Sequence, residues 1–277
     1  MTSAASSITV LHRTADDRRR TLRRAVGRAG FAAVILALAA SAVVAQAPAP
    51  TLSAERIAEI IASPDRSAAD RNNDLRRKPA DMLAFIGPRP GMMVLDVSAG
   101  GGYTTELLAR AVGPDGRVFG QSAPRPPGPR TSAMAVTERA AKSAASNMVA
   151  VVQPFEQPAP PELAERGLDL VTLLFNYHDF GHMGVDRTQM NAAIFRALKP
   201  GGSYVVADHS GRSGTGISEA GTLHRVEEAF VRREVEAAGF RLAAEASFLR
   251  NPSDPRDQNT PNPPQPKDEF VLKFVKP

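Results

Sequence analysis

Residues 94–107 read Val-Leu-Asp-Val-Ser-Ala-Gly-Gly-Gly-Tyr-Thr-Thr-Glu-Leu. A short apolar run that ends in an acid, followed by glycines and a helical pattern, predicts a strand, a tight turn and a helix. Glycine permits unusual backbone dihedrals and lets a ligand approach the main chain. Open α/β sheets hold nucleotide-like cofactors at such a turn, at the carboxyl end of a strand. The stretch therefore predicts an α/β fold with a cofactor site at Gly100, Gly101 and Gly102.

The glycine turn does not by itself identify the cofactor. A dinucleotide fingerprint needs glycine or alanine three residues after its second glycine, and an acid about 20 residues further on. Thr105 and Gln121 occupy these two places. A nicotinamide oxidoreductase is therefore weakly supported, and a tight turn that binds no ligand is the other alternative.

Further motifs show a family resemblance. The stretch PGMMVLD (90–96), its glycines, and ALKPGG (197–202) ahead of SYVVA (203–207) resemble a class I S-adenosylmethionine-dependent methyltransferase. NYHDF, GVDR, DHS and TLHRVEEAFVRREVEAAGF more closely resemble bacterial methyltransferases that carry export signals and lack an assigned substrate. The resemblance begins near Pro79. It implies a Rossmann-like, doubly wound, mostly parallel seven-stranded sheet with an antiparallel last strand, S-adenosylmethionine as cofactor, and a small-molecule acceptor.

The N-terminus has the pattern of an export leader. Seven arginines precede an uncharged apolar run from Ala29 to Ala45, which small residues and prolines follow. This order is typical of a secretory signal, although the run has about the minimum length of a membrane span. The expected domains are a signal peptide or inner-membrane anchor (1–47), an N-terminal helix and linker (48–78), and a methyltransferase-like domain (79–277). The expected location is periplasmic, and Arg23-Arg24 loosely resembles a twin-arginine signal.

The charge distribution argues against a nucleic-acid partner. The chain carries a net charge of +5. The leader, with seven arginines and two aspartates, accounts for all of it, because the remainder has equal numbers of acidic and basic residues. A nucleic-acid-binding domain would need a basic face. The absence of cysteine excludes disulfides and thiol chemistry.

Apolar runs and turn residues predict alternating strands and helices. Polar residues 63–78 are expected to form a linker or flap, and residues 222–238 a single long helix. The last two strands, joined by a loop too short for a crossover helix, must be antiparallel. The predicted strands are 93–97, 117–121, 148–152, 168–175, 203–207, 240–248 and 269–275.

The resemblance assigns cofactor contacts to the strand ends. Asp96 would orient the amino-acid part of the cofactor, and the glycines would admit it. Gln121 stands where the family places a carboxylate for the ribose hydroxyls, and Phe155 would stack on adenine or belong to the core. The predicted cofactor-binding residues are Asp96, Ser98, Gly100, Gly101, Gly102, Tyr103, Gln121, Phe155, Asn176 and Tyr177.

Histidines after the fourth and fifth strands are the candidate catalytic groups. An acceptor that loses a proton needs a base, and histidine suits that task near neutral pH. His178 is the first choice, with Asp179 orienting it, and His209 is the second. A metal held by Asp179, His182, Asp208 and His209 is the alternative, but we expect none because the related metal-dependent branch uses acids and an amide.

A second function class keeps the fold without catalysis. Ser98, Gln121 and Gln153 depart from the family pattern, as would suit an inactive exported binding protein for an adenosyl or nucleotide-like ligand. The intact glycine turn and the rim histidines favour the enzyme.

Overall fold

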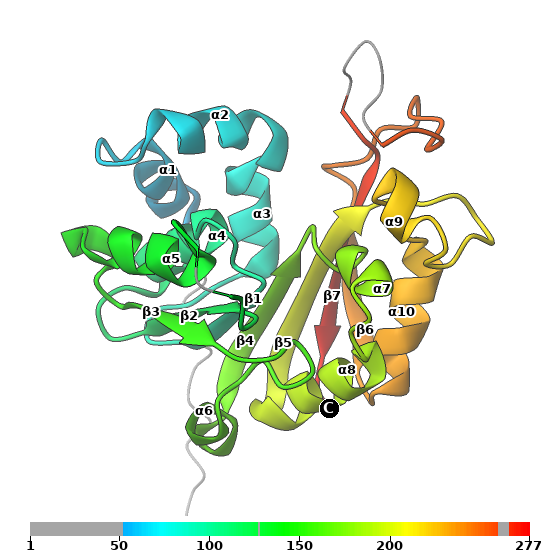
Figure 1. Cartoon of the computed structure of the whole chain (residues 1–277). Helices are drawn as coiled ribbons and strands as arrows, with labels where there is room; N and C mark the ends of the chain where they lie inside the picture. Colours follow the sequence, from blue (N-terminus) through cyan, green and yellow to red (C-terminus); the bar gives the residue numbers. More distant parts are fainter. Residues whose placement is uncertain (1–51, 127, 260–265) are drawn as a thin grey trace, which may run out of the picture. The chain divides into compact units, whose positions relative to one another are not determined.

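The computed structural model describes residues 52–126, 128–259 and 266–277. Its central element is a seven-stranded sheet. The strand order is β3-β2-β1-β4-β5-β7-β6 (Figure 1). Strands β1 to β5 pair in parallel, whereas β7 runs antiparallel to both β5 and β6. The predicted fold class is confirmed. The strands are β1 (Met93–Val97), β2 (Arg117–Ser122), β3 (Met148–Val152), β4 (Leu168–Leu174), β5 (Leu198–His209), β6 (Arg241–Ala246) and β7 (Glu269–Val275).

Helices cover both faces of the sheet (Figure 1). One face carries α1 (Ala54–Ala62), α3 (Pro79–Ile86), α4 (Tyr103–Val112) and α5 (Ser132–Ala140). The other carries α6 (Pro161–Arg166), α8 (Arg187–Ala197) and α10 (Glu228–Ala237). Two short helices, α7 (Asp179–His182) and α9 (Ala220–Leu223), follow the carboxyl ends of β4 and β5.

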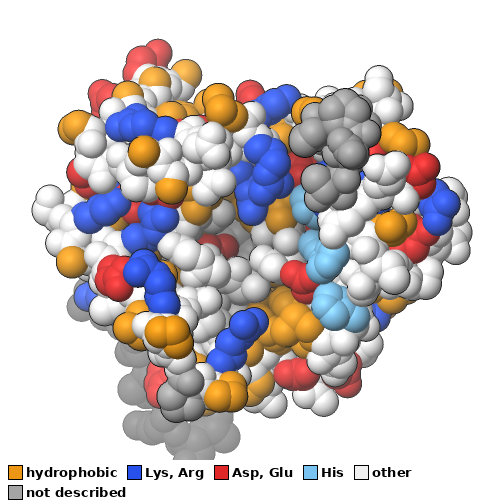
Figure 2. All heavy atoms as spheres, turned by 45° about the horizontal axis from the view of Figure 1, so that its top comes forward, with side chains coloured by type: hydrophobic (Ala, Val, Ile, Leu, Met, Phe, Trp, Pro, Cys, Tyr) orange, Lys and Arg blue, Asp and Glu red, His pale blue; other side chains and the backbone are white. Residues whose placement is uncertain are grey.

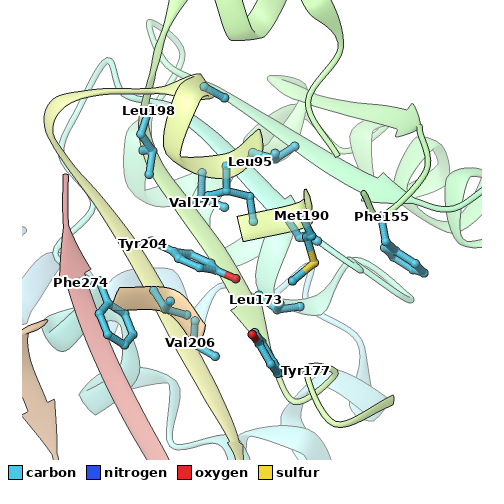
Figure 3. Close-up of a cluster of buried hydrophobic side chains, with 14 of the residues drawn as sticks. Leu95, Phe155, Val171, Leu173, Tyr177, Met190, Leu198, Tyr204, Val206 and Phe274 are labelled. Atoms are coloured by element: carbon cyan, nitrogen blue, oxygen red, sulfur yellow. The ribbon is translucent and has the colours of Figure 1, made fainter. Parts of the chain in front are cut away.

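The strands divide the core into two layers because successive side chains point to opposite faces. In β4, Leu170 belongs to the layer under α1, α3 and α4, while Val171 belongs to the layer under α8 and α10. Val205 and Val206 in β5 divide in the same way. Figure 3 shows the second layer, with Tyr204 and Phe274 among its aromatic side chains.

Residues 63–78, expected as a linker or flap, contain a helix. α2 (Ala68–Arg77) begins at Ser67, whose hydroxyl accepts the Asp70 N–H, and ends at Lys78 in the left-handed conformation. Ten largely polar residues without an apolar stripe give no helical periodicity to read. Tertiary contacts hold this helix in place instead.

The single helix expected over 222–238 is broken. His224 adopts a left-handed backbone with φ of 50°, so α9 ends there and α10 begins at Glu228. Between them Val226 forms a parallel bridge with Ser210, which draws the chain against the end of β5. Pairing with the sheet thus overrides helical propensity at this point.

None of the helices within residues 52–259 and 266–277 is long and apolar enough to cross a membrane. The predicted leader lies outside the described residues.

Candidate functional site

A cavity of about 220 Å³ lies at the turn between β1 and α4, where the sequence predicts the cofactor. The turn is built from left-handed residues: φ is 57° at Ser98, 54° at Gly100 and 78° at Gly102. Figure 2 shows the molecule hollowed at this end of the sheet. Seven residues that the sequence predicts as cofactor contacts line the cavity or form its turn. They are Asp96, Ser98, Gly100, Gly101, Gly102, Tyr103 and Asn176.

Gly102 cannot carry a side chain without displacing its neighbours. A Cβ built there would lie 2.9 Å from the Arg139 Cδ, in addition to the positive φ. A Cβ at Gly101 would meet no atom within 4 Å, and one at Gly100 would meet only the Ser98 carbonyl oxygen, at 4.0 Å. Gly102 therefore serves the packing of α5 against the turn, while the other two leave the backbone open to a ligand.

Asp96 supplies the negative charge at the floor of the cavity. Its side chain is only 3% exposed, and its two oxygens accept hydrogen bonds from Thr105 Oγ1 at 2.6 Å and Thr172 Oγ1 at 2.7 Å. Burial raises the pKa of Asp96 to about 6 despite these bonds. The carboxylate is therefore ionised near neutral pH and fixed in orientation by two hydroxyls.

Arg77, from α2, supplies a positive charge to the same cavity. Its guanidinium lies over the Phe175 ring, 3.8 Å from the centroid. Among the described residues, no carboxylate lies within 4 Å of its nitrogens. Burial, with the neighbouring Arg76, lowers the pKa of Arg77 to about 10, so it remains charged. Sequence reasoning missed this residue because it lay in the supposed linker.

Ion pairs hold α2 over the glycine turn. The Arg139 guanidinium donates to both oxygens of Asp70, at 2.7 and 2.9 Å, and also to Glu106 Oε2 at 2.6 Å. Asp74 accepts from Arg66 and from the Tyr103 hydroxyl, the latter at 2.6 Å. Helix α2 is thereby tied to α4 and α5, which places Asn73 and Arg77 at the cavity.

Gln121, predicted to contact the ribose, is not among the residues that line this cavity. Its side chain is fully buried; the Oε1 accepts the Ser98 N–H at 2.9 Å, and the Nε2 donates to the Gln153 carbonyl at 2.7 Å. The amide thus uses both its acceptor and its donor to join the turn after β1 to the end of β3. Full burial, with these two bonds, holds the amide away from the cavity.

Two predicted cofactor contacts belong instead to the core layer drawn in Figure 3. Phe155 packs against Phe180, with ring centroids 4.4 Å apart. Tyr177 is fully buried, donates its hydroxyl proton to Glu234 at 2.7 Å, and accepts from Asn191. The neighbouring Asn176 does line the cavity, because the chain turns at Phe175 with φ of 65°.

Carboxylates face both ring nitrogens of His178, the first choice for a base. Its Nδ1 lies 2.6 Å from Asp208 Oδ1, and its Nε2 lies 3.2 Å from Asp179 Oδ1. Burial lowers the pKa of His178, but the bonds to these carboxylates outweigh it and raise the value to about 9. His178 is therefore protonated near neutral pH in this arrangement and has no free lone pair.

His209, the second choice, is mostly buried behind His178, with ring centroids 5.4 Å apart. Its Nδ1 lies 2.9 Å from Glu269 Oε1, but not in hydrogen-bonding geometry. Burial lowers the pKa of His209 to about 3, and burial raises the pKa of Glu269. This histidine is therefore neutral near pH 7 in this arrangement.

The structure also separates the residues considered as metal ligands. Asp208 lies behind His178, His182 lies beside His224 with ring centroids 5.8 Å apart, and His224 Nδ1 is 3.3 Å from Asp179 Oδ1. Sequence reasoning placed His224 on an ordinary helix, since nothing in the pattern marks the break there.

Solved structures share this architecture. A methyltransferase from Aquifex aeolicus, titled as S-adenosylmethionine-dependent, matches 81% of this chain and 99% of its own, with a TM-score of 0.55 and 18% identity. A Haloferax volcanii protein solved with the Trm112 methyltransferase activator matches 76% of this chain and 93% of its own, with a TM-score of 0.53 and 20% identity.

Comparison of sequences gives a match to only a short part of the chain. No family model matches the chain. A protein-L-isoaspartate O-methyltransferase from Aeropyrum pernix is 55% identical over 38 residues, which span 14% of this chain and 15% of that protein. The structural likeness establishes one conclusion: the chain has the class I methyltransferase fold.

Proposed function

We propose that the protein is an S-adenosylmethionine-dependent methyltransferase with a small-molecule acceptor. One observation carries the proposal: Asp96 and Arg77, of opposite charge, line one cavity at the glycine turn. The amino-acid end of S-adenosylmethionine is a zwitterion, with an ammonium and a carboxylate on one carbon. A buried anion and a guanidinium without a carboxylate partner among the described residues match these two groups in sign.

A dinucleotide fits the same cavity less well. Its diphosphate would lie at the turn and the start of α4, where it would rely on backbone N–H groups and the helix dipole. The buried Asp96 carboxylate would then repel it in a medium of low dielectric constant. The charges therefore favour the sulfonium amino acid over a nicotinamide cofactor.

The cofactor would supply an electrophilic methyl group, and this chain's residues would position it. Arg77 would hold the cofactor carboxylate, Asp96 would lie on the ammonium side, and the Gly100–Gly101 backbone would border the ligand. Methyl transfer is an in-line displacement in which orientation accounts for much of the rate. Asn176 connects the two parts of the site, since it lines the cavity and donates to Asp179 Oδ2 at 2.9 Å.

Calorimetric titration tests the proposal. The full chain is titrated with S-adenosylmethionine, S-adenosylhomocysteine and NAD⁺, and we expect binding of the first two. Arg77→Met should weaken binding of S-adenosylhomocysteine by about 10- to 100-fold, because a hydrogen bond to a charged group contributes about 1.5 to 3 kcal/mol. Arg76→Met is the matched control, since Arg76 pairs with Glu269 and lines a different cleft. Binding of NAD⁺ alone, or undiminished affinity in Arg77→Met, would refute it.

We further propose that residues 1–47 direct export. The arginine-rich region, apolar run and small residues support this. Fusion of these residues to a reporter that is active only outside the cytoplasm should give signal. Replacement of Arg23-Arg24 by Lys-Lys should abolish the signal if the twin-arginine route is used, and a silent fusion would refute export.

A further inference from the structure

Histidines from separate segments gather at the rim formed by the ends of β4 and β5. Figure 2 shows them in a row along one side of the hollow, next to acidic side chains. The rings of His178 and His224 are 5.5 Å apart between centroids and nearly perpendicular. His178 directly precedes α7, whereas His224 lies at the break between α9 and α10. Only the folded chain brings these two residues, 46 positions apart in sequence, to one place.

The two imidazoles converge on one carboxylate oxygen. Asp179 Oδ1 lies 3.2 Å from His178 Nε2 and 3.3 Å from His224 Nδ1. One possible ligand atom from each of the three residues lies within 4.8 Å of the other two. Ligands about 2.1 Å from a metal ion are about 3.0 Å apart at a right angle and about 3.4 Å apart at a tetrahedral angle. Both oxygen–nitrogen distances fall within that interval.

A second layer of contacts fixes the orientation of these ligands. Asp208 Oδ1 lies 2.6 Å from His178 Nδ1, and Asp208 itself accepts the backbone N–H groups of His178 and His209. Asn176 holds the other oxygen of Asp179. In metal sites, a ligating histidine usually bonds a carboxylate through its second nitrogen. His178 has this arrangement, with Nε2 directed at Asp179.

We propose that His178 Nε2, Asp179 Oδ1 and His224 Nδ1 bind one divalent first-row transition-metal ion. The metal would take the place of the proton on His178 Nε2, which is released to solvent. Two imidazoles and one carboxylate suit Zn²⁺, Fe²⁺ or Co²⁺, whereas Mg²⁺ and Ca²⁺ prefer oxygen ligands. Ion pairs alone would also account for the short distances. An ion pair alone, however, needs only one imidazole, whereas here two imidazoles from separate segments are directed at the same carboxylate oxygen.

Zinc titration of the full chain after chelator treatment tests the site. We expect one Zn²⁺ per chain. His224→Gly should weaken binding by more than about 100-fold, since loss of a ligand exceeds the 10- to 100-fold effect typical of outer-layer partners. Glycine keeps the left-handed conformation and offers no ligand atom. His182→Ala is the matched control in the same row of histidines, and should stay within about threefold of the wild type.

Two further measurements keep the result decisive. Asp208→Asn, a change at a positioning residue, should weaken Zn²⁺ binding by about 10- to 100-fold, and Co²⁺ should give the wild type a visible spectrum that His224→Gly lacks. Equal loss in His182→Ala and His224→Gly, or wild-type binding in His224→Gly, would overturn the assignment. The chelated chain should still bind S-adenosylhomocysteine, so this site and the proposed cofactor site can fail independently.

Discussion

Two parts of the site differ in how fully their polar groups are satisfied. At the turn after β1, backbone and two side chains of opposite charge border a cavity, and Arg77 has no carboxylate partner among the described residues. At the rim after β4 and β5, His178 and Asp179 are already paired with each other. The first part is therefore prepared for an outside ligand that carries both charges. The second part can bind a ligand only by displacing existing contacts. A metal ion between the His178 nitrogen and the Asp179 carboxylate would do this.

The two parts of the site also differ in the residues that support them. The cavity depends on a polar layer outside it, in which Arg139 joins Asp70 and Glu106. The rim depends on a buried carboxylate beneath it, Asp208. Ligand binding and fold stability should therefore respond separately to changes in these two layers.

The largest effect is expected at Gly102. In Gly102→Val, a β-branched side chain meets a positive φ and the Arg139 Cδ at once, which should cost about 3 kcal/mol of stability and reduce S-adenosylhomocysteine affinity by more than about 100-fold. Urea unfolding and calorimetry measure the two effects. Gly128→Val is the control, because a Cβ at Gly128 meets no atom within 4 Å. Undiminished affinity in a folded Gly102→Val protein would place the ligand elsewhere.

Gln121→Glu separates a structural role from ligand binding. The carboxylate would lose the donor to the Gln153 carbonyl in a fully buried position, so we expect a cost of about 2 to 3 kcal/mol in the free energy of unfolding and no gain in affinity. Gln153→Glu is the control, since Gln153 contributes its backbone carbonyl. Tighter S-adenosylhomocysteine binding in Gln121→Glu would restore the predicted ribose contact.

Tyr177→Phe and Tyr204→Phe form a matched pair within the core of Figure 3. The first removes a hydroxyl bonded to Glu234 and Asn191 and should cost about 1 to 2 kcal/mol. The second removes a buried hydroxyl that has no partner within the described part of the chain, and should be neutral or slightly stabilising. Thermal unfolding distinguishes them. A change in cofactor affinity in Tyr177→Phe would contradict its place in the core.

The smallest effect concerns pH and the anchoring of α2. Burial would raise the pKa of Asp70, but hydrogen bonds from Arg139 and Ser67 outweigh it and lower the value to about 2. Because the folded value is below the unfolded one of about 3.9, this contribution is present above pH 4 and disappears as the pH falls toward 2. We expect about 1 kcal/mol after solvent screening. The acid-dependent loss should be smaller in Asp70→Asn; an unchanged pH profile would exclude this group.

The sheet and the glycine turn are readable from the sequence because they depend on local patterns. Buried strands appear as short apolar runs, and a turn with left-handed residues shows its glycines. Asp96 and Gly100 were predicted for the same reason, since the residues after a strand must lie at its carboxyl end. The antiparallel position of β7 follows from a connection too short for a crossover helix.

Alternation along the chain after β4 explains why neighbouring predicted site residues lie in different surroundings. Asn176 and Tyr177 are adjacent in sequence, yet one lines the cavity and the other lies in the core. The positive φ at Phe175 decides which side each takes, and a bulky residue gives no sequence signal of such a conformation. Gln121 lies at the predicted strand end, but its side-chain amide donates to the backbone carbonyl of Gln153, which is distant in sequence.

The sequence by itself determined the fold class and the position of the cofactor turn, since periodicity, glycine and strand-end acids are local properties of the chain. Only the tertiary structure decided that Arg77 and Asp96 line one cavity, that α2 forms at all, and that His224 lies beside Asp179. Each of these depends on long-range ion pairs or sheet contacts that override local propensity. Their energies depend on distance in space, which residue spacing along the chain does not encode.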